Sequence, residues 1–238
     1  MLKINSLDYS IQDQPLFEAL SFHLKQGENL CILGENGIGK STLAKLLCGL
    51  IPSQRAIMIQ GRYIEDIPAK KRARYINYIP AKLEFYDGYV SVSDFLKLSS
   101  LDQDIPKKKI ENTLARLGLK SHKNATLETL SSGESQLLLL ASALIQNAQL
   151  TIFDEPTANL DPKKTKQVFS LLKSKQHFKQ IILITHDLQL AYKLDLPILY
   201  LDKGKTQGIQ KDFFEAKNLA KHFDDTIMIL QNNIVRKL

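Results

Sequence analysis

A glycine-rich run that ends in lysine and serine is the first stretch of the chain whose residue types could do chemistry. It reads Gly34-Glu35-Asn36-Gly37-Ile38-Gly39-Lys40-Ser41 and matches the pattern G-x-x-x-x-G-K-[ST]. Glycines let the backbone approach phosphate oxygens, and the N–H groups at a helix start present positive potential to an anion. Lys40 can reach the β- and γ-phosphates of a nucleotide, and the Ser41 hydroxyl can ligate Mg²⁺. The run therefore predicts a nucleotide phosphate site, against the alternative of a glycine-rich turn without a ligand.

Two adjacent carboxylates, Asp154 and Glu155, form the second candidate group. They follow the mostly apolar run Leu150–Phe153, which is expected to be a buried strand. In open α/β sheets, ligands bind at the carboxyl ends of the strands. Asp154 would bind Mg²⁺ directly or through water, and Glu155 would orient and deprotonate a water molecule on the γ-phosphate side. Alone, the pair could be an acidic strand ending; together with the glycine-rich run it favours ATP hydrolysis.

These groups need a scaffold of strands and helices, and the apolar pattern predicts one. Short β-rich apolar runs, typical of buried strands, occur at Leu30–Leu33, Ile57–Ile59, Ile76–Ile79, Leu150–Phe153, Ile181–Ile184 and Ile198–Leu201. Helical stretches between several of them are expected at Thr42–Leu50, Gln136–Gln146 and Lys163–Lys175. Alternating strands and helices predict an α/β fold with a mainly parallel sheet.

Two other regions differ from this core pattern. Leu2–Asn5 and Phe17–Leu24 alternate apolar with polar residues, which predicts antiparallel strands before the parallel core. Residues 83–136 lack strand-like runs and are expected to be helical, at Ser93–Leu98 and Lys107–Gly118. Because no repeat, low-complexity segment or flexible linker interrupts the chain, residues 1–238 are predicted to form a single domain with a helical insertion.

Composition limits the functional classes. The chain has 238 residues, 44% hydrophobic and 24% charged, which is the balance of an ordinary globular protein. The net charge of +7 is scattered along the chain, so it gives no specific indication of nucleic acid. The basic clusters Lys70–Arg74 and Lys107–Lys109 are expected to be solvated helix faces, and the alternative is contact with lipid head groups or nucleic acid. Cys31 and Cys48 stand in apolar surroundings and are expected to be buried thiols. No apolar run reaches the roughly 20 residues that span a bilayer, and the first residues lack a signal-like stretch, so we expect a cytosolic protein that meets a membrane through a partner.

A third motif precedes the acidic strand: Leu130-Ser131-Ser132-Gly133-Glu134-Ser135-Gln136. Ser131, with Glu134 three residues later, predicts a capping box at a helix start. The motif also resembles the LSGGQ signature of ATP-binding cassette (ABC) transporter subunits, and the resemblance covers essentially the whole chain. It implies a P-loop NTPase cassette with a RecA-like parallel-sheet core, an antiparallel β subdomain and a helical insertion. In that family the signature of one subunit closes on ATP held by another, which would bring Ser131, Gly133 and Glu134 to ATP in trans.

Further positions match the same family. Asn159–Asp161 resembles the D-loop that links two sites, with Asp161 as a site residue; the alternative is a turn before a proline. His186 resembles the switch histidine that contacts the γ-phosphate and supports Glu155. Tyr9 matches the aromatic that stacks on adenine, although an aromatic at a strand end is often a core residue. The resemblance also implies ATP contacts from the phosphate loop, at Gly34, Glu35, Asn36, Gly37, Ile38, Gly39, Lys40, Ser41 and Thr42.

One position departs from the family pattern. The family has a glutamine after a strand that ends in proline, whereas Tyr78-Ile79-Pro80 is followed here by Ala81. Alanine has no side-chain oxygen to ligate Mg²⁺ or to position water. Nucleotide sensing through the backbone or water, or a weakened ATPase, is therefore expected at this loop, while the other motifs favour an active enzyme.

The resemblance also implies partners. The chain would dimerise with itself or with a paired ATPase subunit and drive integral membrane permease subunits at the cytoplasmic face of the membrane; the same system could include a periplasmic binding protein. In that family the segment that corresponds to Lys82–Leu98 receives the coupling helix of the permease, here in an apolar groove. The alternative is that these apolar residues pack within the helical insertion. The groove candidates are Phe85, Tyr86, Tyr89, Val90 and Phe95.

The transported substrate is inferred from two segments. Gly61–Ser93 and Asn218–Phe223 resemble importers of iron–siderophore, haem and vitamin B12. This favours import of an iron chelate or another metal-containing substrate. The alternatives are an exporter ATPase subunit, a non-transport ABC ATPase, and a nucleotide-binding regulator without turnover.

Overall fold

The chain divides into two units. Contacts between Cα atoms group Met1–Glu65 with Ile182–Leu238 in the first unit and Asp66–Ile181 in the second. Among the residues predicted above, Phe85, Tyr86 and Asn159 lie outside the described part of the chain. The computed structural model describes residues 1–84, 89–100, 105–158, 160–174, 176–202, 205–206, 208–223, 227–230 and 233–236.

An antiparallel sheet in the first unit has the strand order β2-β1-β4-β5. Its strands are β1 (Leu2–Ile11), β2 (Gln14–Leu24), β4 (Ile57–Ile59) and β5 (Arg62–Tyr63), and a 3₁₀ turn, Ile64–Asp66, follows. Gln12 and Asp13 both have positive φ angles, as a two-residue hairpin turn between twisted strands requires. The predicted N-terminal strands are confirmed but longer than expected. Ile57–Ile59 belongs to this antiparallel sheet, a correction to its placement among the parallel strands, because it pairs with β1.

Parallel strands form the other sheet region of the first unit. β3 (Leu30–Gly34) lies between β8 (Ile181–Thr185) and β9 (Ile198–Asp202), parallel to both, and β10 (Lys205–Thr206) pairs antiparallel with β9. Every residue of β3 and β8 is buried, so their near-continuous apolar sequences are those of strands covered on both faces. The helices of this region are α1 (Lys40–Leu47) and α7 (Leu188–Leu194).

The end of the first unit adds α8 (Ala216–Phe223) and a hairpin of β11 (Ile227–Leu230) and β12 (Asn233–Arg236). Gln189 of α7 anchors the hairpin, because its side chain accepts a hydrogen bond from the Ile234 N–H (2.7 Å). The rings of Tyr200 and Phe213 contact each other and the ring of His222, a residue of α8. The sequence pattern did not predict these elements.

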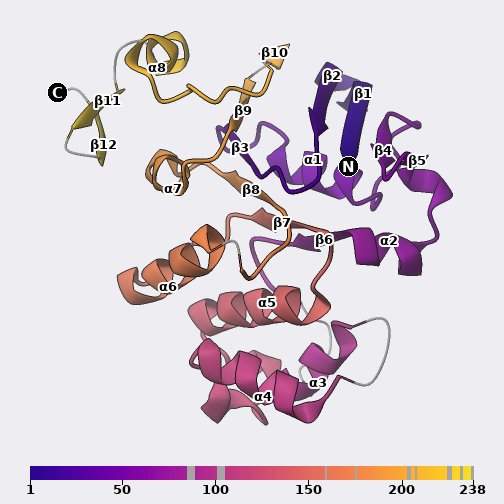
Figure 1. The fold of residues 1–238 in the computed structure, drawn as a ribbon, viewed down its shortest axis with the longest axis vertical. Coiled ribbons are helices and arrows are strands. Elements are labelled where there is room, and N and C mark those ends of the chain that lie inside the picture. The colour runs from indigo at the N-terminus through magenta and orange to yellow at the C-terminus, as the bar shows by residue number, and fades with distance from the viewer. Residues whose placement is uncertain are drawn as a thin grey trace. The chain divides into compact units, whose positions relative to one another are not determined.

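The second unit combines two parallel strands with helices. β6 (Ile76–Ile79) pairs with β7 (Leu150–Asp154), and Tyr78 lies opposite Ile152. In Figure 1, α3 and α4 lie beside α5, which buries one long apolar stretch. The helices are α2 (Ala69–Tyr75), α3 (Val92–Leu98), α4 (Lys107–Arg116), α5 (Ser132–Gln146) and α6 (Pro162–Lys173), with 3₁₀ turns at Lys120–His122 and Leu127–Thr129.

Glycines and helix caps explain where the ends of the observed helices differ from the predicted ones. All six predicted apolar strands are present. The first core helix ends at Leu47, three residues early, because Gly49 adopts a positive φ of 63°. α5 begins four residues before the predicted Gln136, since Ser131 caps it. α4 ends at Arg116, and Gly118 follows with a φ of 74°.

Two predictions about the chain as a whole concern thiols and membranes. Cys31 and Cys48 are both buried thiols, as predicted. Across the described ranges, no helix combines the length and apolar character that a membrane crossing needs.

Candidate nucleotide-binding site

The glycine-rich run forms the turn between β3 and α1 in the first unit. Gly37 and Gly39 have φ angles of 84° and 100°, a region that residues with side chains rarely adopt. A Cβ atom on Gly39 would also lie 2.8 Å from Cγ of Leu16 on β2. A Cβ atom on Gly34 would lie 2.8 Å from the Leu201 carbonyl oxygen. The glycines therefore permit both the shape of the turn and its close packing.

Lys40 lies inside this turn. Its ammonium donates hydrogen bonds to the carbonyl oxygens of Gly34 (2.7 Å) and Glu35 (2.9 Å), and the residue is only 6% exposed. α1 has no acidic residue in its first turn and no side-chain cap. The positive end of the helix dipole and a lysine ammonium therefore occur at one turn, an arrangement suited to phosphate. Ser41, which is exposed, and Thr42, which is half-buried, follow on the same helix.

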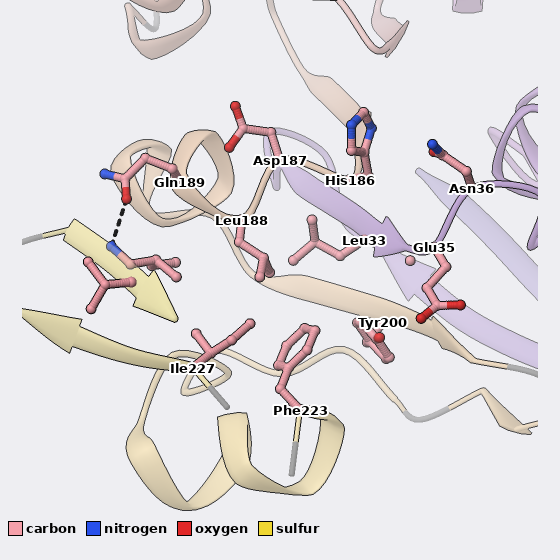
Figure 2. Close-up of a pocket in the computed structure, with 13 residues that line it drawn as sticks. Leu33, Glu35, Asn36, His186, Asp187, Leu188, Gln189, Tyr200, Phe223 and Ile227 are labelled. Carbon is pink, nitrogen blue, oxygen red and sulfur yellow. Dashed lines mark hydrogen bonds between the residues drawn. The ribbon is translucent and has the colours of Figure 1, made fainter. Parts of the chain in front are cut away.

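A cavity of about 920 Å³ lies beside the phosphate loop (Figure 2). Gly34, Glu35 and Asn36 line it from the loop, and His186 lines it from the residue after β8. Its volume is in the range of ligand pockets, about 300–1,000 Å³. Burial raises the pKa of Tyr200 on another wall, and nearby carboxylates, Glu35 included, act in the same direction. The structure thus brings the predicted switch histidine and the start of the phosphate loop to one cavity.

The backbone on either side of His186 is fixed by hydrogen bonds. The Asp187 N–H donates to the Thr185 hydroxyl oxygen (3.0 Å), and the Asp187 carboxylate accepts from the Leu190 N–H (3.0 Å), which caps α7. His186 itself is exposed. A solvent-facing imidazole on a fixed backbone can meet a ligand without displacing core residues.

Asp154 and Glu155 stand at the end of β7, in the second unit. Asp154 is 2% exposed, and its Oδ2 accepts a 2.8 Å hydrogen bond from the Tyr78 hydroxyl of β6. Glu155 is half-buried with a φ of 46°, an uncommon conformation for a residue with a side chain. The Ala158 N–H donates to the Glu155 carbonyl (3.0 Å) and closes the turn. Backbone strain of this kind gathers at functional sites, which is in keeping with the predicted role of Glu155.

The signature motif forms the capped start of α5, also in the second unit. The Ser131 side chain accepts from the Glu134 N–H, and the Glu134 carboxylate accepts from the Ser131 N–H (2.8 Å), so the predicted capping box is confirmed. Hydrogen bonds from the Ser131 hydroxyl and N–H hold the pKa of Glu134 below its usual value. A Cβ atom on Gly133 would lie 2.9 Å from the Lys164 ammonium. Glu134 is therefore ionised at neutral pH, where the family signature has an uncharged glutamine.

Asp161 and Tyr9 have structural partners of their own. The Asp161 carboxylate caps α6 by accepting from the Lys164 N–H (2.9 Å), a bond that lowers the pKa of Asp161. Tyr9 is half-buried on β1 and lies opposite Phe17. Their contacts with ATP stay predictions.

The alanine that departs from the family pattern lines a cavity of about 400 Å³ within the second unit. Gln136 of α5 lines the same cavity; it is 3% exposed, and its side-chain Nε2 has no hydrogen-bond partner. A buried amide without a partner is costly to the stability of the fold. A longer side chain at Ala81 would have room here.

Two residues that support the candidate site were not predicted from the sequence. Tyr78 holds Asp154, and Leu16 packs against Gly39. The pairing of β6 with β7 brings Tyr78 to Asp154, and no local sequence signal indicates that pairing or the position of Leu16. Of the groove candidates, Tyr89 is 93% exposed, whereas Val90 and Phe95 are half-buried, and the groove stays a prediction.

A phosphate loop between a parallel strand and a helix, in a chain with an acidic strand end, defines a P-loop nucleotide-binding protein of the α/β class. The chain belongs to the ABC transporter family, whose model matches residues 17–158. It is an ATP-binding subunit of this family and an ABC-type ATPase. The antiparallel sheet and the parallel core are those of the ABC cassette fold.

Three relatives illustrate the similarity. The energy-coupling factor transporter ATP-binding protein EcfA1 of Fusobacterium nucleatum subsp. nucleatum is 36% identical over 99% of this chain and 92% of its own length. A putative ABC transporter ATP-binding protein of Streptococcus mutans serotype c is 32% identical over 81% of this chain, which spans only 36% of that protein. The structure of cbiO1 from Clostridium perfringens, part of the ABC transporter complex cbiONQ, has a TM-score of 0.74 and 25% identity, with 94% of each chain covered.

Proposed function

We propose that this chain is a single ABC cassette that hydrolyses ATP, pairs with a second cassette, and drives an importing permease at the cytoplasmic face of the membrane. The observation that carries the proposal is the phosphate loop, with the buried Lys40 ammonium inside it. Similarity to EcfA1 over nearly the full chain supports the transporter role. If the permease imports its substrate, the same system would include a periplasmic binding protein. Copurification of such a protein with the transporter complex tests this part of the proposal.

The proposed chemistry is attack of water on the γ-phosphorus of ATP. Glu155 accepts the proton from that water, and the released products are ADP and phosphate. Lys40 and the loop N–H groups hold the phosphates, and His186 contacts the γ-phosphate. Ser41 and Asp154 would hold Mg²⁺, because hydroxyl and carboxylate oxygens are donors that it prefers, and the bound ion would neutralise phosphate charge.

The remaining roles complete the site across two copies. Ser131, Gly133 and Glu134 at the start of α5 would meet the nucleotide of the second copy, and Asp161 would lie at the junction. Tyr9 would stack on adenine, since every base offers a π-face. The proposed transported substrate is an iron chelate or another metal-containing compound, supported by the sequence of Gly61–Ser93.

The test uses the chain purified with its permease in lipid. Glu155→Gln should lower ATP hydrolysis about 100-fold or more, because the proton acceptor is lost, while ATP binding persists. Glu18→Gln, at an exposed position of β2, is the matched control and should retain the rate. Unchanged hydrolysis in Glu155→Gln, or no membrane protein bound to the chain, would contradict the proposal. Uptake of labelled iron chelate by the reconstituted complex tests the substrate separately.

A further inference from the structure

A cleft of about 600 Å³ in the second unit has no place in the nucleotide chemistry. It lies along α4, the end of α5 and the segment before β8, and α4 and α5 lie side by side in Figure 1. Among the residues that the structure describes, no aspartate or glutamate lines it. We call it the basic cleft, and its polar wall is formed by Lys108, Lys109, Asn112, Arg116, Gln176 and His177.

The charge of the basic cleft comes from one face of α4. Lys108, Asn112 and Arg116 are spaced four residues apart, so they share a stripe of the helix. The single carboxylate of α4, Glu111, is engaged elsewhere, in a 2.6 Å ion pair with Lys123. That bond lowers the pKa of Glu111, and the charge of Lys107 adds to the effect. All three lysines of the run Lys107–Lys109 are exposed, as expected of a solvated helix face. Lys107 lies near Glu111, and the next two lysines line the cleft.

Arg116 and His177 are in direct contact inside the cleft. The guanidinium Nη2 donates to the imidazole Nε2, because a guanidinium has no acceptor. Burial lowers the pKa of His177, and the charge of Arg116 adds to this, so the imidazole is kept neutral. The guanidinium is always charged, and no carboxylate stands among the described residues that line this wall.

Part of the basic character has a structural explanation. Lys109 donates to the Ile145 carbonyl (3.1 Å), and Lys179 donates to the Asn147 carbonyl (3.0 Å). Both lysines complement the negative end of the α5 dipole. This accounts for Lys109 and Lys179, and Arg116 in the last turn of α4 complements the dipole of that helix in the same way. Lys108 stands in the first turn of α4, where the dipole does not favour a cation, so its charge has no such explanation.

We propose that the basic cleft binds a phosphate group, carried by a soluble phosphorylated molecule or by a lipid headgroup. Arginine offers a planar fork of donors that matches phosphate, and lysine adds a compact charge. The side-chain amides of Asn112 and Gln176 supply further donors on the same walls. A volume of about 600 Å³ admits more than an isolated phosphate ion. The site is independent of the proposed ATPase role.

The first experiment titrates pyrophosphate into the full chain by calorimetry. The chain carries Lys40→Ala, so that the phosphate loop does not dominate the signal. Replacing Lys108 and Arg116 by glutamine together should weaken binding about tenfold or more, since two charge-assisted contacts are lost. Lys107→Gln with Lys120→Gln makes the same charge change beside Glu111 and should alter binding less than about twofold. Lys108→Arg should preserve the affinity, and thermal unfolding confirms that each variant is folded.

The second experiment separates the two sources of phosphate. Phosphatidylcholine vesicles with and without phosphatidic acid are sedimented with the same variants. Recruitment by phosphatidic acid that depends on Lys108 and Arg116 identifies a headgroup site, and pyrophosphate binding with the same dependence identifies a soluble ligand; either outcome supports the proposal. The proposal is overturned if neither pyrophosphate nor phosphatidic acid binds saturably. It is also overturned if replacing Lys107 and Lys120 weakens binding as much as replacing Lys108 and Arg116.

Discussion

Two helix starts in this chain carry glycine motifs, yet their chemistry is opposite. At α1 the capping residue is Gly39, no side chain caps the helix, and no acid stands in the first turn. At α5, Ser131 and Glu134 bond to each other's backbone N–H groups, and the first turn is negatively charged. An uncapped start beside a lysine suits an anion, whereas a self-capped start is already satisfied. The α1 start is thus suited to bind phosphate. The α5 start would bind phosphate only through backbone N–H groups that take no part in its capping box.

The largest effect is expected at the α1 start. Lys40→Ala removes the only cation held inside the loop among the described residues, so ATP binding should weaken about 100-fold or more. Titration of a fluorescent ATP analogue measures it. Lys45→Ala, an exposed position in the last turn of α1, is the control and should bind normally. Micromolar affinity in Lys40→Ala would contradict the phosphate-loop assignment.

A second test concerns the charge at the α5 start. Glu134→Gln keeps a capping-box residue but removes a negative charge that would oppose the phosphates of a second copy. Dimerisation driven by a non-hydrolysable ATP analogue should tighten on the order of three- to tenfold, measured by sedimentation. Glu128→Gln, an exposed glutamate of the preceding turn, should leave dimerisation unchanged. Equal or weaker association of Glu134→Gln would show that the carboxylate does not oppose ATP.

The two starts should also differ in stability. Gly39→Ala forces a side chain into a φ of 100° and against Leu16, and it should cost about 1–3 kcal/mol of unfolding free energy. Ser131→Ala loses the cap of α5 and should cost about 1 kcal/mol. Urea unfolding measures both. Gly27→Ala, at a φ of 80° with no atom within 4 Å, separates backbone strain from the clash. A smaller loss for Gly39→Ala than for Gly27→Ala would contradict the packing argument.

How far the sequence predicts this molecule depends on the range of each interaction. The glycine-rich turn between a strand and a helix, the capping box and the apolar strands are local patterns, and each was found where it was predicted. The bond from Tyr78 to Asp154 spans 76 residues and depends on strand pairing that no local pattern specifies. For the same reason Ile57–Ile59 was placed in the wrong sheet, since a three-residue apolar run does not identify its partner.

Side-chain placement on helices was predictable only in part. A lysine run such as Lys107–Lys109 indicates a charged helix face, but the position of Glu111 and the fold decide which lysine faces which neighbour. The cavity at Ala81 likewise follows from packing of a loop against α5. The sequence shows that alanine replaces the family glutamine at position 81. It does not show that the buried amide of Gln136 lines the same cavity as Ala81.

The smallest expected effect is a pH dependence found at one helix start and not at the other. Hydrogen bonds from Ser131 lower the pKa of Glu134 in the folded chain, so the ionised carboxylate contributes stability above its unfolded value of 4.5. That contribution is lost as the pH falls from 4.5 through the lowered folded pKa. The unfolding temperature of Glu134→Gln should therefore fall less than that of the parent between about pH 5 and pH 3. Other carboxylates with lowered pKa values, such as Asp161, remain in both proteins and cancel in the comparison. Equal losses would mean that the capping box holds without the charge of Glu134, and the contrast between the two starts would then rest on geometry alone.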